Sequence, residues 1–284
     1  MPESTSPTAD TVEAPPEPEL SGALAGLKVA DLSDLAAYDE AVTAGRQIGF
    51  GYFFPHILGY NRPGQSAALL AEDKGSICVF RWKQSAALPR LDLIVAPTPM
   101  NHAVLSRCLE RANDFNGDTS ARVLKVDEDD VEAVLSTNCL RVVKRKAQYI
   151  FSPAVYRDLS GGRFRGIRRY IYKFEGLDNL EFEAYSPRLK SACLELLRQW
   201  RRIHRSAHGT LGGVGKTKQL LELADRLAAP SLEGEVILLD GNVIAFAMGG
   251  QLRPGVGVFA EAKSDHGLSG LSIYQRYHLS LIHI

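Results

Sequence analysis

A glycine-rich stretch, GTLGGVGKTKQLLELAD at 209–225, places Gly-Lys-Thr ahead of a segment with helical periodicity. Glycine, four residues and then Gly-Lys-Ser/Thr form a loop whose backbone N–H groups hold phosphate. The match fails by one position, because the required glycine would stand at 210, which is Thr210. Such a loop also follows a buried strand, whereas the preceding segment has helical periodicity. We therefore predict a flexible linker that begins a helix at 216–228, and nucleotide hydrolysis is the less favoured hypothesis.

Asp240 is a second candidate for this chemistry, because it ends the apolar run EVILLD and could hold a magnesium ion. The residues around it give a simpler interpretation. Asp-Gly-Asn joins two apolar runs, and this pattern predicts a β-hairpin at 235–249.

His204 and His208 stand four residues apart on a predicted helix, which is the spacing of two metal ligands. No third ligand is evident in the sequence. We interpret the pair as a solvated helix end and predict no metal site.

Basic residues are concentrated in one part of a chain that has 33 basic and 33 acidic residues overall. Residues 141–173 carry ten Lys or Arg against one acid, and 198–205 adds four arginines. The acidic run 127–132 suits the first turn of a helix, where the dipole is positive. The basic block indicates either a solvated face or a surface for an anionic partner, such as nucleic acid, anionic lipid or the phosphates of a cofactor.

The composition limits the class of protein. With 284 residues, 45% of them hydrophobic, the chain can form one large domain or two of ordinary size. It has four widely spaced cysteines, no run of about 20 apolar residues and no signal peptide. These features predict reduced thiols, no transmembrane segment, a cytoplasmic location and a disordered tail over 1–24.

Strands and helices alternate along the chain, which predicts an α/β or mixed α+β fold. We expect the aromatic stretch 50–60 to pack irregularly. Besides the hairpin, strands are predicted at 76–82, 91–97, 121–126, 140–152, 180–185 and 255–262. Helices are predicted at 31–47, 101–113 with Asn101 as its cap, 128–137, 163–174, 187–204 and 216–228, and from about Leu268.

Three stretches of the second half resemble one known family. They are YIFSPAVYRDLSGGRFRGIRRYIYKF at 149–174, GNVIAFAMGG at 241–250 and VFAEAKSDHGLSGLSIYQRY at 258–277. Together they resemble the C-terminal domain of phosphatidylglycerol lysyltransferases, a family that also includes many stand-alone proteins of unknown function. The resemblance covers roughly 145–280 well and the first half loosely.

Single positions both match and depart from the family's motifs. Arg163 and Arg168 stand at the second lysine and the arginine of its basic motif, whereas Gly162 and Arg169 replace a lysine and an asparagine. The later Glu-Lys-Ala of the family appears here as Glu-Ala-Lys at 261–263.

The resemblance implies a tandem of two GNAT-like (acetyltransferase-like) domains, at 25–140 and 141–284. Family members of known activity move an aminoacyl group from charged tRNA to phosphatidylglycerol. The implied chemistry is acyl transfer, which needs oriented N–H donors or a cation beside the oxyanion and a base for the nucleophile.

The same resemblance implies a set of site residues. Glu261 or His266 would act as the base, and Lys263 would add positive charge. The bend at 264–270 leads into a predicted helix, whose free N–H groups would hold phosphates of the donor. The donor-binding candidates are Arg163, Arg165, Arg168, Arg169, Gly267, Ser269 and Gly270.

The chain ends in LSLIHI directly after a predicted helix, where the implied fold would add further strands. This ending is similar to translated sequencing adaptor. We therefore expect the natural sequence to depart from this chain near Tyr277 and to continue, which leaves the second domain incomplete here.

Three functions follow from these observations. The leading hypothesis is an aminoacyl transferase that uses charged tRNA and a lipid or small acceptor. An acyl-CoA-dependent N-acyltransferase is the alternative enzyme, and a non-catalytic module that binds RNA or a phospholipid headgroup is the alternative of another class. No cofactor is predicted beyond the donor, which is aminoacyl-tRNA or acyl-CoA. The predicted partners are tRNA and an anionic phospholipid surface, the latter through peripheral docking.

Overall fold

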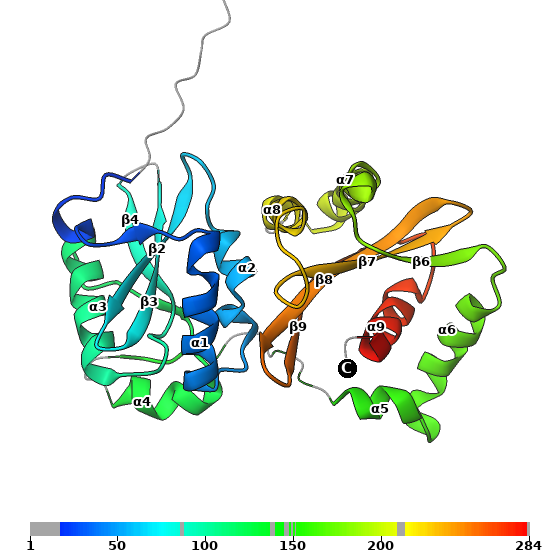
Figure 1. Cartoon of the computed structure of the whole chain (residues 1–284), viewed down its shortest axis with the longest axis horizontal. Coiled ribbons are helices and arrows are strands. Elements are labelled where there is room, and N and C mark those ends of the chain that lie inside the picture. The colour runs from blue at the N-terminus through cyan, green and yellow to red at the C-terminus, as the bar shows by residue number, and fades with distance from the viewer. Residues whose placement is uncertain are drawn as a thin grey trace, which may run out of the picture.

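The structure is a computed structural model that describes residues 18–85, 88–136, 140–144, 148, 150, 152–208 and 214–282, without the side chains of 155–157, 205–208 and 281–282. Two sheets lie side by side, and helices pack on both faces of each sheet (Figure 1). No helix in these residues is long and apolar enough to cross a membrane.

The first sheet has the strand order β1-β2-β3-β4-β5. Its neighbours are antiparallel except β4 and β5, which are parallel. In chain order, this half contains β1 (Lys28–Val29), α1 (Leu35–Gly45), α2 (Phe54–Leu58), β2 (Ser66–Asp73), β3 (Ser76–Lys83), β4 (Arg90–Val95), α3 (His102–Asn116), β5 (Val123–Lys125) and α4 (Val131–Leu135).

The second sheet has the order β6-β7-β8-β9 and is antiparallel throughout. In chain order, this half contains α5 (Pro153–Asp158), α6 (Arg165–Glu175), β6 (Leu180–Ala184), α7 (Lys190–His208), α8 (Val214–Ala224), β7 (Glu233–Leu239), β8 (Asn242–Arg253), β9 (Val256–Ser264) and α9 (Leu271–Ile282). Short 3-10 turns lie at Gly22–Leu24, Leu32–Asp34, Phe50–Tyr52, Glu128–Asp130, Gly162–Phe164 and Pro187–Leu189.

The two halves repeat one order of elements. The first runs β1-α1-α2-β2-β3-β4-α3, and the second runs β6-α7-α8-β7-β8-β9-α9. This confirms the predicted mixed α/β class with two sheets. The predicted domain boundary at 140–141 falls between α4 and α5 and stays a prediction.

One hydrophobic cluster is built from both halves. Tyr38, Phe54 and Ile57 of α1 and α2 are fully buried in the same cluster as Leu197 of α7 and Leu220 of α8. Figure 1 shows α2 and α8 lying side by side between the two sheets, and their residues are in contact. Apolar burial is the main stabilising contribution in folding, so this shared cluster holds the two sheets together.

The outer face of each sheet has its own cluster. In the first half, α3 packs there through residues such as Val104 and Leu105. In the second half, α6 and α9 pack through Phe174 and Tyr274, whose rings stack at 5.1 Å. Successive strand residues point to opposite faces, so the sheet has two faces that can be covered. Helices α7 and α8 cover one face of the second sheet, and α5, α6 and α9 lie below the other (Figure 1).

The hairpin at Asp240 is confirmed. Asp240 and Gly241 both adopt left-handed backbone, at φ 52° and 73°, and Leu239 pairs with Asn242. Two left-handed residues between paired strands make the type I′ turn for which Asp-Gly is suited. Asn179 donates a hydrogen bond to the exposed Asp240 carboxylate at 2.7 Å, so this acid serves the turn.

Three other expectations were wrong or incomplete. The stretch 50–60 contains α2, in which Pro55 occupies the first turn and the side chains are buried. Strand β2 was not predicted, because its alanine-rich SAALLAED lacks β-branched residues. Residues 140–144 have no regular structure where a strand was expected, and part of 145–151 lies outside the described residues, as do 209–213 before α8 and Cys139.

Candidate functional site

A pocket of about 370 Å³ opens where β9 turns into α9. Residues of α7, β9, the bend and α9 surround it, and they are Trp200, Ala262, Ser264, Asp265, His266, Leu268, Ser269, Gly270, Ser272, Gln275 and Arg276. Of the three residues from α9, Gln275 and Arg276 lie three and four positions after Ser272, which places both next to Ser272 on the helix surface.

The bend is held by its own polar contacts and by α6. The Gly267 N–H donates to Asp265 Oδ1 at 2.8 Å, and Lys173 Nζ of α6 donates to the Ser269 carbonyl at 2.9 Å. Gly270 is left-handed at φ 89°, and a Cβ built on it would overlap the Tyr170 ring of α6. The bend therefore requires glycine at this position both for its backbone and for the close approach of α6.

Three N–H groups at the start of α9 have no acceptor among the residues that the structure describes, and they belong to Ser269, Gly270 and Ser272. Unpaired N–H groups at a helix N-terminus attract an anion or a polarised carbonyl oxygen. Of the predicted donor-binding residues, Ser269 and Gly270 line the pocket, and Gly267 lies in the same bend.

Glu261 and Lys263 form an ion pair on β9, with 2.6 Å between Lys263 Nζ and Glu261 Oε2. Two residues apart on a strand, they lie on the same face of the sheet. Lys263 is buried, and its Nζ lies 4.8 Å from the centre of the Trp200 ring. The pair does not line the pocket and meets it through the contact of Lys263 with Trp200, which does.

His266 lines the pocket, and its side chain is exposed. Its ring centre is 4.4 Å from that of His204 on α7. Partial burial is the main cause that lowers the pKa of His266, and the neighbouring His204 lowers it further. Asp265 acts in the opposite direction. A lowered pKa favours the neutral imidazole, which is the form that accepts a proton.

Gln275 is a pocket residue that the sequence did not reveal. Its side chain is 1% exposed, and its Nε2 has no hydrogen-bond partner in the described part of the chain. A buried amide without a partner is costly, so its N–H groups are available to an oxygen of a bound molecule. Trp200 and Arg276 were also missed, and the four-residue spacing of Arg276 from Ser272 was the available signal.

The predicted arginines of α6 and its preceding turn do not line this pocket. Arg168 donates to the carbonyls of Leu159 and Gly161, so it fixes its own loop. Arg163 lies over the Phe164 ring at 4.5 Å. Arg163, Arg165 and Arg169 are exposed, and α6 reaches the bend through Tyr170 and Lys173 instead.

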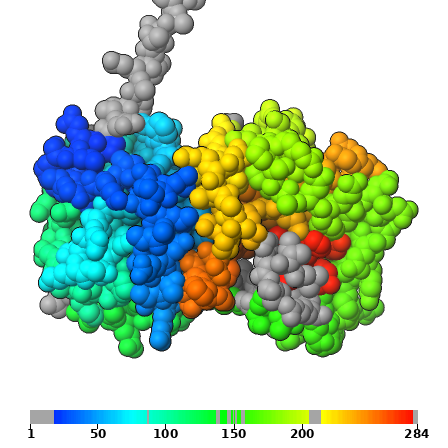
Figure 2. Space-filling model, viewed as in Figure 1, coloured from blue at the N-terminus to red at the C-terminus, as the bar shows by residue number. Residues whose placement is uncertain are grey.

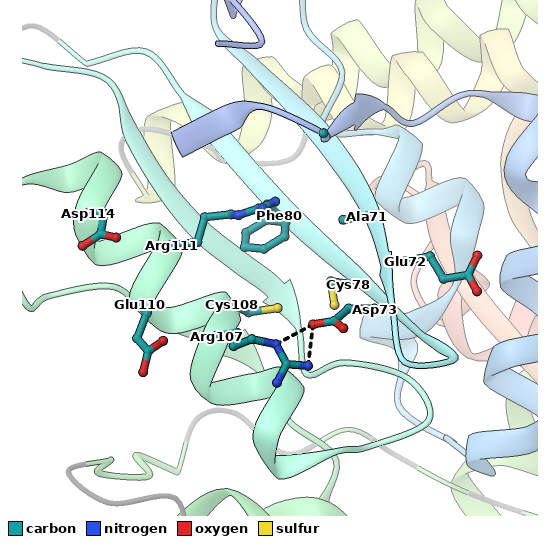
Figure 3. A pocket seen from close by; sticks show the side chains of 11 residues that line it. Ala71, Glu72, Asp73, Cys78, Phe80, Arg107, Cys108, Glu110, Arg111 and Asp114 are labelled. Atoms are coloured by element: carbon teal, nitrogen blue, oxygen red, sulfur yellow. Dashed lines mark hydrogen bonds and ion pairs between the residues drawn. The ribbon is translucent and has the colours of Figure 1, made fainter. Parts of the chain in front are cut away.

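A second pocket, of about 420 Å³, lies between β3 and α3 of the first half. Figure 3 shows Arg107 of α3 turned toward Asp73 of β2, and their charged groups are 2.6 Å apart. Beside them the buried Cys78 and Cys108 thiols contact each other and are free, as predicted. The charged Arg107 is thus already paired, which leaves less for a ligand here. No group of three or more metal-ligating side chains occurs in the described residues.

Solved structures similar to this chain share its fold. A conserved protein of unknown function from Bacteroides thetaiotaomicron VPI-5482 has a TM-score of 0.63 at 16% identity, covering 89% of this chain and 85% of that one. The C-terminal domain of a putative lysylphosphatidylglycerol synthetase from Agrobacterium fabrum has 0.59 at 12% identity, with 89% and 75% covered. L-PGS from Bacillus licheniformis has 0.58 at 16% identity, with 88% and 71% covered. At these identities the likeness establishes the fold alone.

The sequence comparison is more specific. No curated protein matches the chain. The family described as phosphatidylglycerol lysyltransferase, C-terminal, matches residues 60–260, which is well over half of the sequence. This agrees with the motifs at 149–174 and 241–250 and supports a transferase-like role in general. The chain belongs to the phosphatidylglycerol lysyltransferase C-terminal family.

Proposed function

We propose that the protein transfers an aminoacyl group from charged tRNA to a lipid or small acceptor at the pocket beside the bend. The observation that carries this proposal is the set of groups gathered there. His266 is an exposed imidazole biased toward its neutral form, and Gln275 offers an unpaired amide donor. Unpaired N–H groups begin α9 beside them. Family membership supports the same reaction class.

The reaction assigns a role to each group. The acceptor's amine or hydroxyl attacks the ester carbonyl carbon and loses its proton to His266. Negative charge then develops on the carbonyl oxygen, where the Gln275 amide and the N–H groups of the bend donate hydrogen bonds. Collapse of this intermediate breaks the bond to the ribose oxygen, and His266 returns the proton to that leaving oxygen.

Glu261 and Lys263 have a supporting role in this proposal. Lys263 holds the Glu261 carboxylate at 2.6 Å, which keeps it from acting as a free base. The pair instead fixes Trp200, whose ring forms one wall of the pocket and contacts the Lys263 ammonium. Glu261, which the sequence resemblance implied as a base, stays the alternative to His266.

The exposed arginines of α6 supply the phosphate contacts of the proposal. Helix α6 packs beside the bend through Tyr170 and Lys173. Arg165 and Arg169 on its exposed side could hold the backbone of a tRNA whose acylated end enters the pocket. Such contacts give affinity that falls steeply with salt. An R165Q/R169Q variant should therefore bind tRNA more weakly and with a flatter salt dependence, whereas R226Q, at an exposed arginine of the same half, should not.

The deciding experiment is a donor screen. The protein is incubated with mixed aminoacyl-tRNAs or with acyl-CoA, together with phosphatidylglycerol vesicles or small amines, and products are identified by mass spectrometry. An aminoacylated acceptor formed with loss of aminoacyl-tRNA supports the proposal. Release of thiol from acyl-CoA indicates the N-acyltransferase instead. Binding of tRNA or vesicles without turnover of either donor indicates a non-catalytic module and overturns the proposed reaction.

A further inference from the structure

Basic side chains from both halves meet where α2 lies against α8, in a group we call the junction cluster: His56, Arg62, Lys125 and Lys216. His56 Nε2 is 3.0 Å from Lys125 Nζ and 3.5 Å from Lys216 Nζ. The Arg62 guanidinium lies 3.9 Å from the position of a Cβ built on Gly215, next to Lys216. Figure 2 shows α8, the helix that carries Lys216, at the surface between the two halves.

The junction cluster has no acid of its own. Within the described residues, Arg62, Lys125 and Lys216 form no ion pair with a carboxylate. Glu261 of β9 is the acid that acts on Lys216, and Lys263 already holds it at 2.6 Å. The neighbouring Arg81 of β3 adds charge, and its guanidinium is paired with Asp92 at 2.7 Å. Aromatic rings partly stabilise the two ammonium groups, since Lys216 Nζ lies 3.4 Å from the centre of the Tyr60 ring and Lys125 Nζ lies 4.6 Å from that of Phe50. No paired carboxylate among the described residues balances the positive charge of the cluster.

Keeping these charges together is unfavourable. Burial first, and then Lys125, Arg62 and Arg81, lower the pKa of Lys216 to about 7. Burial also lowers the pKa of Lys125 to about 8, and burial with the two lysines lowers that of His56 well below its usual value. Like charges in a partly desolvated site disfavour their protonated forms, and an incoming anion would reverse this effect.

Unpaired donors accompany the charge. The Nε of Arg62 and the Nδ1 of His56 are buried without a hydrogen-bond partner in the part of the chain that is described. His56 is 6% exposed, and Arg62, Lys125 and Lys216 are half-buried. Buried donors are ordinarily satisfied, and their presence beside unbalanced cations points to an acceptor-rich ligand.

We propose that the junction cluster binds a phosphate-class oxyanion, which bridges Arg62 and Lys125 of the first half and Lys216 of the second. A guanidinium with two ammonium groups matches the several oxygen acceptors and the negative charge of such an anion. The inference does not depend on the proposed reaction, because the cluster lies on α2, the loop from α2 to β2, β5 and α8, and shares no residue with the pocket at the bend.

The cluster also gives a role to the Gly-Lys-Thr motif at 215–217. Its glycine spacing does not form a phosphate-binding loop, and Thr217 is fully buried, so its hydroxyl faces no ligand. In the proposed site, Lys216 binds the phosphate together with side chains from distant parts of the chain, whereas a phosphate-binding loop uses consecutive backbone N–H groups.

Calorimetric titration of the full chain tests the proposal, with inorganic phosphate and the soluble phosphodiester glycerophosphoglycerol as two arms. Preference for phosphate assigns a terminal phosphate group as the natural ligand, and preference for the diester assigns a lipid headgroup. We expect K216Q and R62Q each to weaken binding at least tenfold, because each removes a charged donor. K218Q, at an exposed lysine of the same helix, should change the Kd less than twofold.

The number of protons taken up when the anion binds is a readout that a folding defect would not reproduce. Sulfate, which does not titrate near neutral pH, is bound at pH 8 in two buffers of different ionisation enthalpy. The wild-type protein should take up a fraction of a proton, because the anion raises the pKa of Lys216, and K216Q should take up less. Thermal unfolding without ligand checks that the variants fold. Failure of the wild type to bind either phosphate arm at 10-millimolar order, or equal binding by K216Q, R62Q and K218Q, overturns the proposal.

Discussion

The connection from β4 to α3 and the connection from β9 to α9 occupy the same place in the two halves but differ in their polar groups. In the first, the Asn101 side chain accepts from the Val104 N–H at 3.2 Å, and Thr98 is buried and donates to Gln47 at 2.6 Å. In the second, glycine bends replace the cap, and N–H groups at the start of α9 keep no acceptor among the described residues. The His102 and Ala103 N–H groups of the first connection likewise have no acceptor among the described residues, so the two connections differ in the side-chain cap and in the pocket that adjoins only the second.

This difference teaches that the shared topology does not decide where a site forms. Each helix start exposes N–H groups that something must satisfy. At α3 the Asn101 side chain accepts from one of these groups, and at α9, where no side chain does so, a pocket adjoins the helix start.

The largest effect is expected from a substitution of Gly270, in the connection from β9 to α9. Ala in place of Gly270 combines left-handed backbone with overlap of the Tyr170 ring, so G270A should lower the free energy of unfolding by about 3 kcal/mol. Gly117, at the end of α3, is the matched control, because it is left-handed at φ 67° but a Cβ there meets nothing. G117A should cost about 1 kcal/mol in urea unfolding. Equal losses would contradict the packing of α6 on the bend.

The proposed base is tested by exchanging histidines at the two helix starts. H266Q should reduce the turnover of the donor identified in the screen about a hundredfold, because general-base catalysis contributes at least that much. His102, the first residue of α3, is exposed and lies at the corresponding place in the first half. H102Q should leave turnover within twofold. A larger loss in E261Q than in H266Q would assign the base to Glu261.

Gln275 separates a binding role from a structural one. Q275L removes the unpaired amide, so turnover should fall about tenfold through loss of one oxyanion donor. Stability should stay unchanged or rise slightly, because an unsatisfied buried group is replaced by an apolar one of similar size. Loss of stability together with turnover in urea unfolding and rate measurements would show that the amide has a structural partner.

The smallest effect concerns the capped helix. N101A removes the acceptor for the Val104 N–H and should lower the free energy of unfolding by about 1 kcal/mol. Hydrogen exchange at the first turn of α3 should quicken with it, while exchange in α9 stays the same. An unchanged stability would mean that Asn101 does not satisfy the start of α3, and the contrast between the two connections would weaken.

Much of the fold follows from local sequence patterns. The β-branched SICVFRW and LDLIVAP form β3 and β4, and Asn101 caps α3 as predicted. Asp-Gly at 240–241 marks the β7–β8 turn because only certain residues tolerate left-handed backbone there. Strand β2 escaped prediction because alanine has no strong preference for strands, and its pairing with β3 and β1 decides its conformation.

The site was harder to predict for a physical reason. The bend at 264–270 shows itself locally through its glycines, but the groups that complete the pocket come from other elements. Trp200 arrives from α7 and Lys173 reaches the bend from α6, and such contacts depend on tertiary packing. Density of charge was also a poor guide, since the exposed arginines of α6 lie outside the pocket. Lys125, which no motif marks, and Lys216, from a motif whose glycine spacing does not fit a phosphate-binding loop, meet at the junction.

The hydrophobic cluster that both halves share has a consequence for how the chain tolerates change. Tyr38 and Phe54 are shielded from water partly by residues of α7 and α8, so either half alone would expose a contiguous apolar surface to solvent. Harm done by a substitution in one half is therefore felt by the other, and a compensating substitution can arise across the interface. We therefore expect the two halves to evolve together, although each repeats the same order of elements.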